Sequence, residues 1–481
     1  MKYLFPLFFV LFFSLSLVQI SAQTAVENFV NHDLLRNATI SLLVRDLDTG
    51  ETVAEYRANN SAIPASTLKL ITSATALELL GPNYRFRTQL QISGTIDENG
   101  VLNGNLYIFG GGDPTLGSAR VPNNREFLSG WSREIRRAGI RRINGSIVGD
   151  ASLFDNEGVN PQWTWETIGN SHASGTFGIS YLDNTARVHF NSGARGTTPT
   201  ITRVVPEIPG LEFRNYLTST AIGRDSANFS GAPLSNVRAI HGEIPENRPN
   251  FTSTMDIPDP ALLLAQHLHN RLIADGVAIA NPPSAMYQPV VGSAERQTIH
   301  THHSLPLSWI SAEINMRSNN HYSEHVFRYL ALQRDQIATT NGAMRVIRNH
   351  WQQRGLPVDQ LFMFDGSGLS RVNNVSAEFL VQLLEYMQTQ SEVSDEFFES
   401  LPVGGKSGTI ARIFARAPLG GNTHAKSGSL RRIRGYAGYI KLQDRNLTFA
   451  VLVNHFNAPP AQIVREIENF LKAVIEENQN Q

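Results

Sequence analysis

Pro64-Ala65-Ser66-Thr67-Leu68-Lys69 is a Ser-x-x-Lys sequence at the start of an expected helix. Pro64 is a helix start signal, and Gly81-Pro82 ends the apolar pattern. Three residues are nearly one helical turn, so the Lys69 amine is expected beside the Ser66 hydroxyl, where a neutral amine can take its proton. The positions expected on one helical face are Leu68, Ile71, Thr72, Thr75 and Leu79.

Lysine is rare in this chain, which gives the Ser-x-x-Lys sequence more weight. The chain has six lysines, at positions 2, 69, 406, 426, 441 and 472, among its 41 Lys+Arg residues. Arginine stays protonated in proteins, whereas a lysine can lose its proton near neutral pH and act as a base. The alternative is a helix-start serine followed by a solvated lysine, and the short sequence alone does not exclude it.

Two further short sequences carry polar groups suited to the same site. Ser318-Asn319-Asn320 is a Ser-x-Asn sequence in or beside a helix, and its alternative interpretation is a polar helix cap. Lys426-Ser427-Gly428-Ser429 precedes a hairpin expected over residues 435–442 and 447–454. A cation, a hydroxyl and a glycine on an edge strand let a substrate backbone lie alongside, with its carboxylate held by charge and hydroxyl.

Lys406-Ser407-Gly408 also spells Lys-Ser-Gly and competes with Lys426 for this role. We favour Lys426, because the strand-like stretch and the hairpin that follow it supply an edge strand. Lys406 precedes a basic run whose secondary structure is ambiguous.

Ser-x-x-Lys, Ser-x-Asn and Lys-Ser/Thr-Gly, in this chain order, resemble the three motifs of penicillin-binding proteins and serine β-lactamases. Ser66 and Ser318 are 252 residues apart, which resembles the class C low-molecular-mass penicillin-binding proteins (peptidase family S13), whose catalytic domain is split by β-rich insertions. Ser427, where Thr is commoner, and Asn319 depart from the usual motifs but keep the needed groups. Other segments that look similar to this family are Gly110–Pro114, Gly149–Ser152, Trp163–Trp165 and Asp365–Arg371.

The resemblance implies an α+β transpeptidase-like fold and a serine D-Ala-D-Ala carboxypeptidase/endopeptidase acting on peptidoglycan stem peptides and cross-links. It implies Ser66 as nucleophile, Lys69 as its base and Ser318 as a proton relay to the leaving amine. Asn320 would orient Lys69 or bind the substrate amide, and β-lactams would be covalent inhibitors. Binding of the substrate carboxylate is implied for Lys426, Ser427 and Ser429 beside Gly428, with the N–H groups of Ser66 and Ser429 as oxyanion hole.

The expected domain organisation is a signal peptide over residues 1–22, a catalytic domain over 23–85 and 295–481, and an inserted β-rich region over 86–294. The insertion reads as short strand-like runs separated by Gly, Asn and Pro, with little helical period. Alternating residues predict a hairpin over 38–56. Ala461–Glu477 is an amphipathic helix, and its net negative polar face favours packing on a sheet over a membrane surface.

The N-terminus predicts export. A positive start, an apolar run from Leu4 to about Ile20 and the small residues Ser21-Ala22 describe a secretory signal peptide cleaved near Ala22. The absence of cysteine excludes disulfides and thiol catalysis and fits a bacterial periplasm. With 41 Lys+Arg against 42 Asp+Glu, the chain lacks the basic field that nucleic-acid binding needs.

No cofactor or metal is expected. His300, His302 and His303 lack a His-Glu-x-x-His pattern or a nearby carboxylate cluster, and no Lys-Ser/Thr follows the triple glycine before Asp113. Two other functions stay open. A serine β-lactamase shares the motifs, but no Glu-x-x-Leu-Asn follows the second one. A catalytically silent peptidoglycan-binding protein would not need Ser66, Lys69 and Ser318 intact. The oligomeric state and the preference for stem peptides or cross-links are not predicted.

Overall fold

The computed structural model describes residues 23–122, 124, 126–289 and 295–479. The expected signal peptide lies outside the described residues. The chain divides into two compact units. The first unit comprises the chain up to Asn83, Leu307–Asn319 and the chain from Ile347 onward, and the second comprises Tyr84–Pro306 and Asn320–Val346.

The first unit is built on a five-stranded antiparallel sheet of order β2-β1-β23-β22-β21. The two hairpins expected from alternating residues form this sheet, and the N-terminal hairpin joins the C-terminal one through β1 and β23. Strand β21 has a sheet partner on one side only, so it is an edge strand. The strands are β1 (Thr39–Asp46), β2 (Thr52–Tyr56), β21 (Thr423–Leu430), β22 (Ile433–Lys441) and β23 (Asn446–Asn454).

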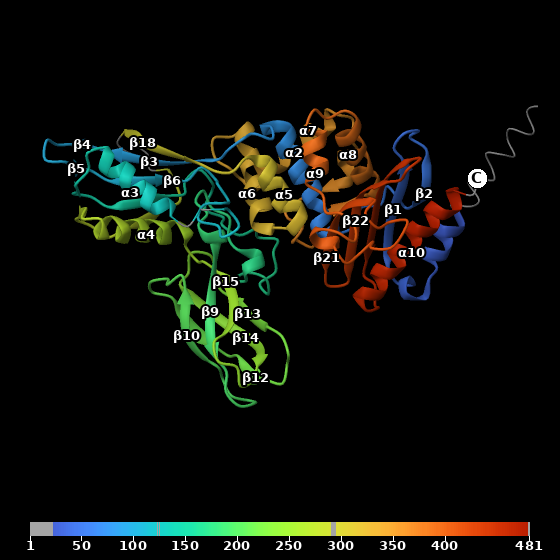
Figure 1. Ribbon diagram of the computed structural model, residues 1–481, viewed down its shortest axis with the longest axis horizontal. Coiled ribbons are helices and arrows are strands. Elements are labelled where there is room, and N and C mark those ends of the chain that lie inside the picture. Colours follow the sequence, from blue (N-terminus) through green and yellow to red (C-terminus); the bar gives the residue numbers. More distant parts are fainter. Residues whose placement is uncertain (1–22, 123, 125, 290–294, 480–481) are drawn as a thin grey trace, which may run out of the picture. The chain divides into compact units, whose positions relative to one another are not determined.

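Helices cover both faces of this sheet (Figure 1). On one face, α10 (Pro460–Gln479) and a helix over residues 23–30 pack their apolar side chains against the strands. The apolar positions expected on the last helix are buried in this core, which confirms packing on the sheet. The first unit also contains α2 (Lys69–Leu80), α5 (Leu307–Arg317), α8 (Ala377–Thr389) and α9 (Ser394–Glu399). Of these helices, α8 contacts β1 and β23.

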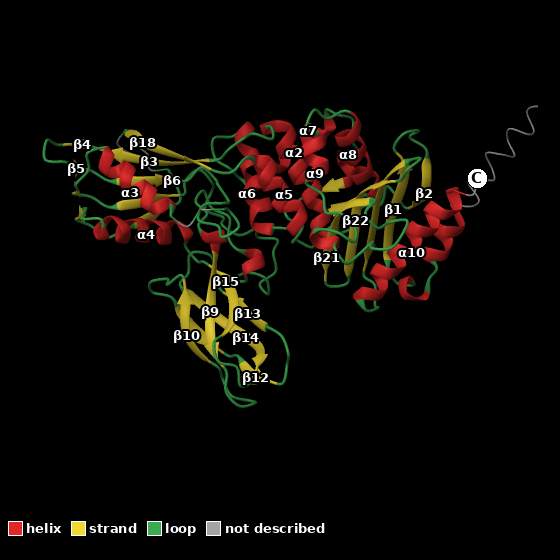
Figure 2. Ribbon diagram, in the orientation of Figure 1, coloured by secondary structure: helices red, strands yellow, loops and turns green. Residues whose placement is uncertain are grey.

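Within its described residues, the second unit contains several small sheets and three α-helices of its own. One mixed sheet has the order β17-β8-β6-β3-β18, and another has the order β16-β7-β5-β4. A separate part, β9 to β15, consists of two small sheets whose strands have no helix between them (Figure 2). The helices are α3 (Phe127–Arg137), α4 (Pro260–Ala274) and α6 (Asn320–Tyr329), while α7 (Thr340–Gln352) crosses the division between the units.

The strands of the second unit have the following bounds: β3 (Arg87–Ser93), β4 (Thr95–Ile96), β5 (Val101–Asn103), β6 (Leu106–Phe109), β7 (Arg142–Ile143), β8 (Ile147–Asp150), β9 (Thr185–Asn191), β10 (Thr200–Val205), β11 (Glu212–Asn215), β12 (Thr218–Thr220), β13 (Ser226–Ser230), β14 (Val237–Pro245), β15 (Phe251–Asp256), β16 (Ala278–Ile279), β17 (Ser284–Met286) and β18 (Arg296–His303). The first unit also has the short pair β19 (Leu361–Phe362) and β20 (Asn374–Val375).

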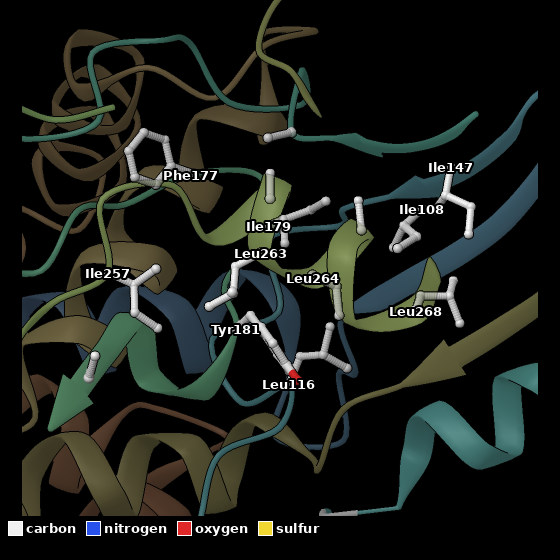
Figure 3. Close-up of a cluster of buried hydrophobic side chains, with 14 of the residues drawn as sticks. Ile108, Leu116, Ile147, Phe177, Ile179, Tyr181, Ile257, Leu263, Leu264 and Leu268 are labelled. Atoms are coloured by element: carbon white, nitrogen blue, oxygen red, sulfur yellow. The ribbon is translucent and has the colours of Figure 1, made fainter. Parts of the chain in front are cut away.

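The hydrophobic core of the second unit lies between α4 and the strands (Figure 3). Leu264 and Leu268 of α4 lie on the side of Ile108 of β6 and Ile147 of β8, whereas Leu263 lies toward Ile257 and Tyr181. Removing these side chains from water gives the second unit a core of its own.

The expectation of little helix in the insertion is wrong for two segments. Helices α3 and α4 both lie within it. In α4, apolar residues dominate and leave a weak polar face, so its helical period was not visible in the sequence.

The insertion was expected over residues 86–294. The longer of the two segments that form the second unit runs from Tyr84 to Pro306. Residue 294 itself lies outside the described residues. Strand β18 pairs with β3 near the start of the insertion, which keeps residues 296–303 in the second unit.

His302 of β18 packs against Phe127 and Trp131 of α3, with ring centroids 5.9 and 5.8 Å away. Over the residues that the structure describes, no group of three or more His, Cys, Asp or Glu is placed to hold a metal ion. Within the same residues, no helix combines the length and apolarity needed to cross a membrane.

Candidate active site

Ser66 and Lys69 lie where the chain enters α2. Ser66 belongs to a single 3₁₀ turn, Ala65–Leu68, and Lys69 is the first residue of the helix. The Lys69 Nζ donates a hydrogen bond to Ser66 Oγ at 3.0 Å. Lys69 is buried, whereas Ser66 is half-buried. The expected contact of the two side chains is therefore present, in a tighter turn than the α-helical one expected.

A loop of the same unit holds Lys69 from its other side. The Lys69 Nζ donates to the carbonyl oxygen of Ser367 at 2.5 Å, and the hydroxyl of Thr72 donates to the carbonyl oxygen of Gly366 at 2.8 Å. Gly368, with φ of +79°, lies so close to Ala65 that an added Cβ would be 1.8 Å from its carbonyl oxygen. The loop thus fixes both the Lys69 amine and the turn before Ser66.

The carboxylate of Asp365 organises this loop. It is buried and accepts hydrogen bonds from Gly368 N at 2.7 Å, Ser370 N at 2.6 Å and Asn373 Nδ2 at 2.8 Å. Hydrogen bonds to an ionised acceptor are stronger than neutral ones. In the sequence, residues 365–371 are recognisable only as a segment similar to the family. Nothing in their pattern predicts a contact with Lys69.

Strand β21 lies against the turn that carries Ser66. A Cβ at Gly428 would be 2.4 Å from Pro64 O and 3.2 Å from Ser66 N, and one at Gly435 of β22 would be 3.3 Å from Pro64 O. Glycine at both positions permits this approach. The Lys426-Ser427-Gly428 sequence therefore lies beside the candidate nucleophile, as expected for an edge strand.

Ser318 follows α5 directly and has a left-handed backbone conformation, with φ of +56°. Its hydroxyl accepts a hydrogen bond from Lys426 Nζ at 3.0 Å. Lys426 is buried and also donates to the carbonyl oxygen of Ser427 at 2.8 Å. Burial, together with the charge of Lys69, lowers the pKa of Lys426 well below its usual value.

These side chains border an open cleft of about 440 Å³. Ser66, Ser318, Ser427 and Ser429 lie along it, and Pro460, Ala461 and Val464 at the start of α10 give it an apolar side. Such a cleft, with apolar walls and a few convergent polar groups, suits a small peptide. The remaining lining residues are Thr409, Ile413, Gly428, Arg434 and Tyr436.

Sequence reasoning missed Thr409 and Arg434. The Ser427 hydroxyl donates to Thr409 Oγ1 at 2.7 Å, which orients the Ser427 side chain. Arg434 lies on β22 opposite Ser429 of β21. Thr409 follows the competing Lys406-Ser407-Gly408 sequence directly, and its link to Ser427 could not be read from local pattern.

Lys406 does not occupy the place of Lys426. It is exposed, in a turn rather than on a strand, and the hydroxyl of Ser407 accepts from the backbone N–H of Val403 at 3.0 Å. Asn320 is the first residue of α6 in the second unit, where its Nδ2 donates to the carbonyl oxygen of His172 at 2.8 Å. The expected action of Asn320 on Lys69 or on a substrate amide stays a prediction.

Comparison with known proteins gives a consistent result. Residues 22–474 match the model of the D-Ala-D-Ala carboxypeptidase 3 (S13) family. The chain is 24% identical to the D-alanyl-D-alanine carboxypeptidase of Actinomadura sp. (strain R39), over 92% of this chain and 82% of that protein. It is 23% identical to the D-alanyl-D-alanine carboxypeptidase DacB of Haemophilus influenzae, over 91% and 92% of the two chains.

The crystal structure of penicillin binding protein 4 (dacB) from Haemophilus influenzae is similar in fold. Its TM-score is 0.79 at 22% identity, and the alignment covers 92% of this chain and 98% of that one. The expected α+β fold and the expected family are both confirmed. The match over residues 22–474 shows that this chain belongs to the D-Ala-D-Ala carboxypeptidase (S13) family of peptidases.

Proposed function

We propose that this protein is a serine D-Ala-D-Ala carboxypeptidase and endopeptidase that cleaves peptidoglycan stem peptides and cross-links through an acyl-enzyme on Ser66. The observation that carries the proposal is the 3.0 Å contact between the Lys69 amine and the Ser66 hydroxyl, at a cleft bordered by edge strand β21. The named relatives are D-alanyl-D-alanine carboxypeptidases, which supports the substrate class.

In the first step Ser66 Oγ attacks the carbonyl carbon of the penultimate D-alanine, and neutral Lys69 takes the hydroxyl proton. Backbone N–H groups of Ser66 and Ser429 would stabilise the oxyanion. The peptide C–N bond then breaks, and Ser318 passes a proton to the leaving amine. Water hydrolyses the resulting ester, which releases the shortened peptide and restores the Ser66 hydroxyl.

Lys426 fits a role as donor to Ser318, because its amine lies 3.0 Å from the Ser318 oxygen. Lys69 and Lys426 are both buried, and two like charges close together in a buried site repel each other, so the pair favours one neutral amine. The first step needs that neutral amine to be Lys69. Ser427 and Ser429, both on the cleft, would bind the substrate's terminal carboxylate.

A cell-wall substrate requires that the protein be exported, and the signal-peptide pattern of residues 1–22 supports a periplasmic location. β-Lactams would acylate Ser66 in place of the peptide. A crystal structure of the Haemophilus influenzae penicillin binding protein 4 is described as complexed with a β-lactam, which supports this part of the proposal.

The proposal is tested by incubating the purified protein with peptidoglycan fragments while following D-alanine release and loss of cross-links. Wild type is expected to release D-alanine and to bind one fluorescent penicillin per chain, whereas Ser66→Ala does neither. Lys69→Arg keeps the charge but removes the base, and should acylate at least about 100-fold more slowly. Equal D-alanine release by wild type and Ser66→Ala would contradict the proposal.

The same experiment separates the alternatives. A serine β-lactamase would turn over penicillin rapidly instead of retaining it. A silent binding protein would take up no penicillin and release no D-alanine, although it would still bind peptidoglycan.

A further inference from the structure

Arg434 is a cation on the candidate cleft for which the mechanism above has no use. It lies on β22, paired in register with Ser429 of β21, and borders the same cleft as Ser66. Its side chain is half-buried, and burial lowers the pKa of its guanidinium.

Two backbone carbonyls and one aromatic ring hold the guanidinium. Arg434 Nη1 donates to the carbonyl oxygens of Leu430 at 3.0 Å and Ile433 at 2.7 Å, the last residue of β21 and the first of β22, and its Cζ lies 5.9 Å from the ring centroid of Phe456. Among the residues that the structure describes, no carboxylate lies within ion-pair distance of Arg434, and its Nε and Nη2 have no hydrogen-bond partner. A partly desolvated cation without a counter-ion is unfavourable, which makes the position suited to an anionic ligand.

Lys426, the basic side chain next to Ser318, does not line the cleft. It is fully buried and already donates to Ser318 and to its own strand. Arg434 is therefore better placed than Lys426 to meet a charged group that enters the cleft from solvent.

We propose that Arg434, together with the Ser429 hydroxyl, binds the terminal carboxylate of the residue that leaves, and so makes the enzyme select substrates with a free carboxylate at that end. The planar guanidinium can bind a carboxylate through two N–H groups, whereas Ser429 adds one hydroxyl. This inference rests on the proposed function and assigns a specificity-determining residue to it.

The test compares two substrates that differ only at the end, an acyl-D-Ala-D-Ala peptide with a free carboxylate and the same peptide with a C-terminal amide. For wild type we expect a higher kcat/KM with the acid. Arg434→Gln should lower kcat/KM for the acid about 10- to 100-fold, the range of a charge-assisted hydrogen bond, and change that for the amide less than about threefold. The acid-to-amide ratio should collapse accordingly.

Arg431→Gln is the matched control. Arg431 is an exposed arginine of the same hairpin, outside the cleft lining, so its loss removes the same charge and should leave the ratio unchanged. An Arg434→Gln enzyme that loses equal activity on acid and amide, or none on either, would overturn the assignment.

A folding defect is checked by the melting temperature, because Arg434 also bonds the hairpin turn. If Arg434→Gln does not fold, the acid-to-amide ratio of Arg434→Lys tests the assignment instead. It keeps the charge but loses the two-pronged geometry, so the acid-to-amide ratio should fall severalfold, and an unchanged ratio would overturn the assignment. Failure of the proposed function itself looks different, because wild type would then cleave neither peptide.

Discussion

A Cβ atom at Gly428 would lie 2.4 Å from the carbonyl oxygen of Pro64, so the edge strand touches the turn before the candidate nucleophile through a residue without a side chain. The glycine of the Lys-Ser-Gly sequence thus serves a steric purpose. It lets β21 come close enough for Ser66 and Ser429 to border one cleft.

Gly428→Ala is expected to push β21 away from this turn, because backbone atoms cannot yield as a flexible side chain can. The rate of acylation by fluorescent penicillin should fall at least about 100-fold, since a displacement near 1 Å in a catalytic site has effects of that size. Gly223→Ala is the matched control, because Gly223 has no atom within 4 Å of its added Cβ. Wild-type labelling by Gly428→Ala would show that the strand has freedom to move.

The proton-relay role of Ser318 can be separated from its backbone conformation. Ser318→Ala and Ser318→Gly both remove the hydroxyl that accepts from Lys426, and both should slow acylation about 10²- to 10⁴-fold. Glycine adopts φ of +56° without steric cost. The free energy of unfolding of Ser318→Gly should therefore be about 1 kcal/mol higher than that of Ser318→Ala. Penicillin labelling and denaturant unfolding measure the two effects. Unchanged labelling in both variants would remove Ser318 from the mechanism.

Local patterns predicted the parts of the site that depend on neighbours in sequence. The Ser66–Lys69 contact spans three residues, and the hairpin expected over 435–442 and 447–454 is observed as β22 and β23. The choice of Lys426 over Lys406 used the same hairpin and agrees with their observed places on an edge strand and in an exposed turn.

Contacts between distant residues were beyond such patterns. Lys69 meets the carbonyl of Ser367 across 298 residues, and a backbone carbonyl carries no signature in sequence. The pairing of β18 with β3 likewise brings together strands about 200 residues apart, which local patterns do not predict. Arg434 looks like any other cation among 35 arginines until register places it opposite Ser429.

The buried Asp365 is expected to matter for both stability and acylation. Asp365→Ala removes the acceptor of three hydrogen bonds and should lower the free energy of unfolding by about 3 kcal/mol or more. Because the same loop presents the Ser367 carbonyl to Lys69, acylation of the folded fraction should slow as well. The exposed Asp359 serves as control, and Asp359→Ala should change stability by less than about 0.5 kcal/mol. Wild-type stability of Asp365→Ala would mean that the loop holds its shape by other contacts.

The second unit is expected to lose stability in mild acid through His325. This ring is buried, its centroid lies 4.3 Å from that of His321, and burial lowers its pKa from 6.5 to about 4. Between these pH values the unfolded chain binds a proton that the folded protein does not bind. The free energy of unfolding therefore decreases as the pH is lowered through this range, and it levels off below about pH 4.

His325→Phe keeps an aromatic ring beside Phe154 but cannot be protonated. Between pH 7 and pH 4, wild type should therefore lose about 3 kcal/mol more of its unfolding free energy than the variant does, as measured by denaturant unfolding at each pH. The same replacement at the exposed His303 should not reduce the pH dependence by a comparable amount. Parallel pH profiles for wild type and His325→Phe would contradict the prediction, because they would mean that the buried ring accepts a proton in the folded protein as readily as in the unfolded chain.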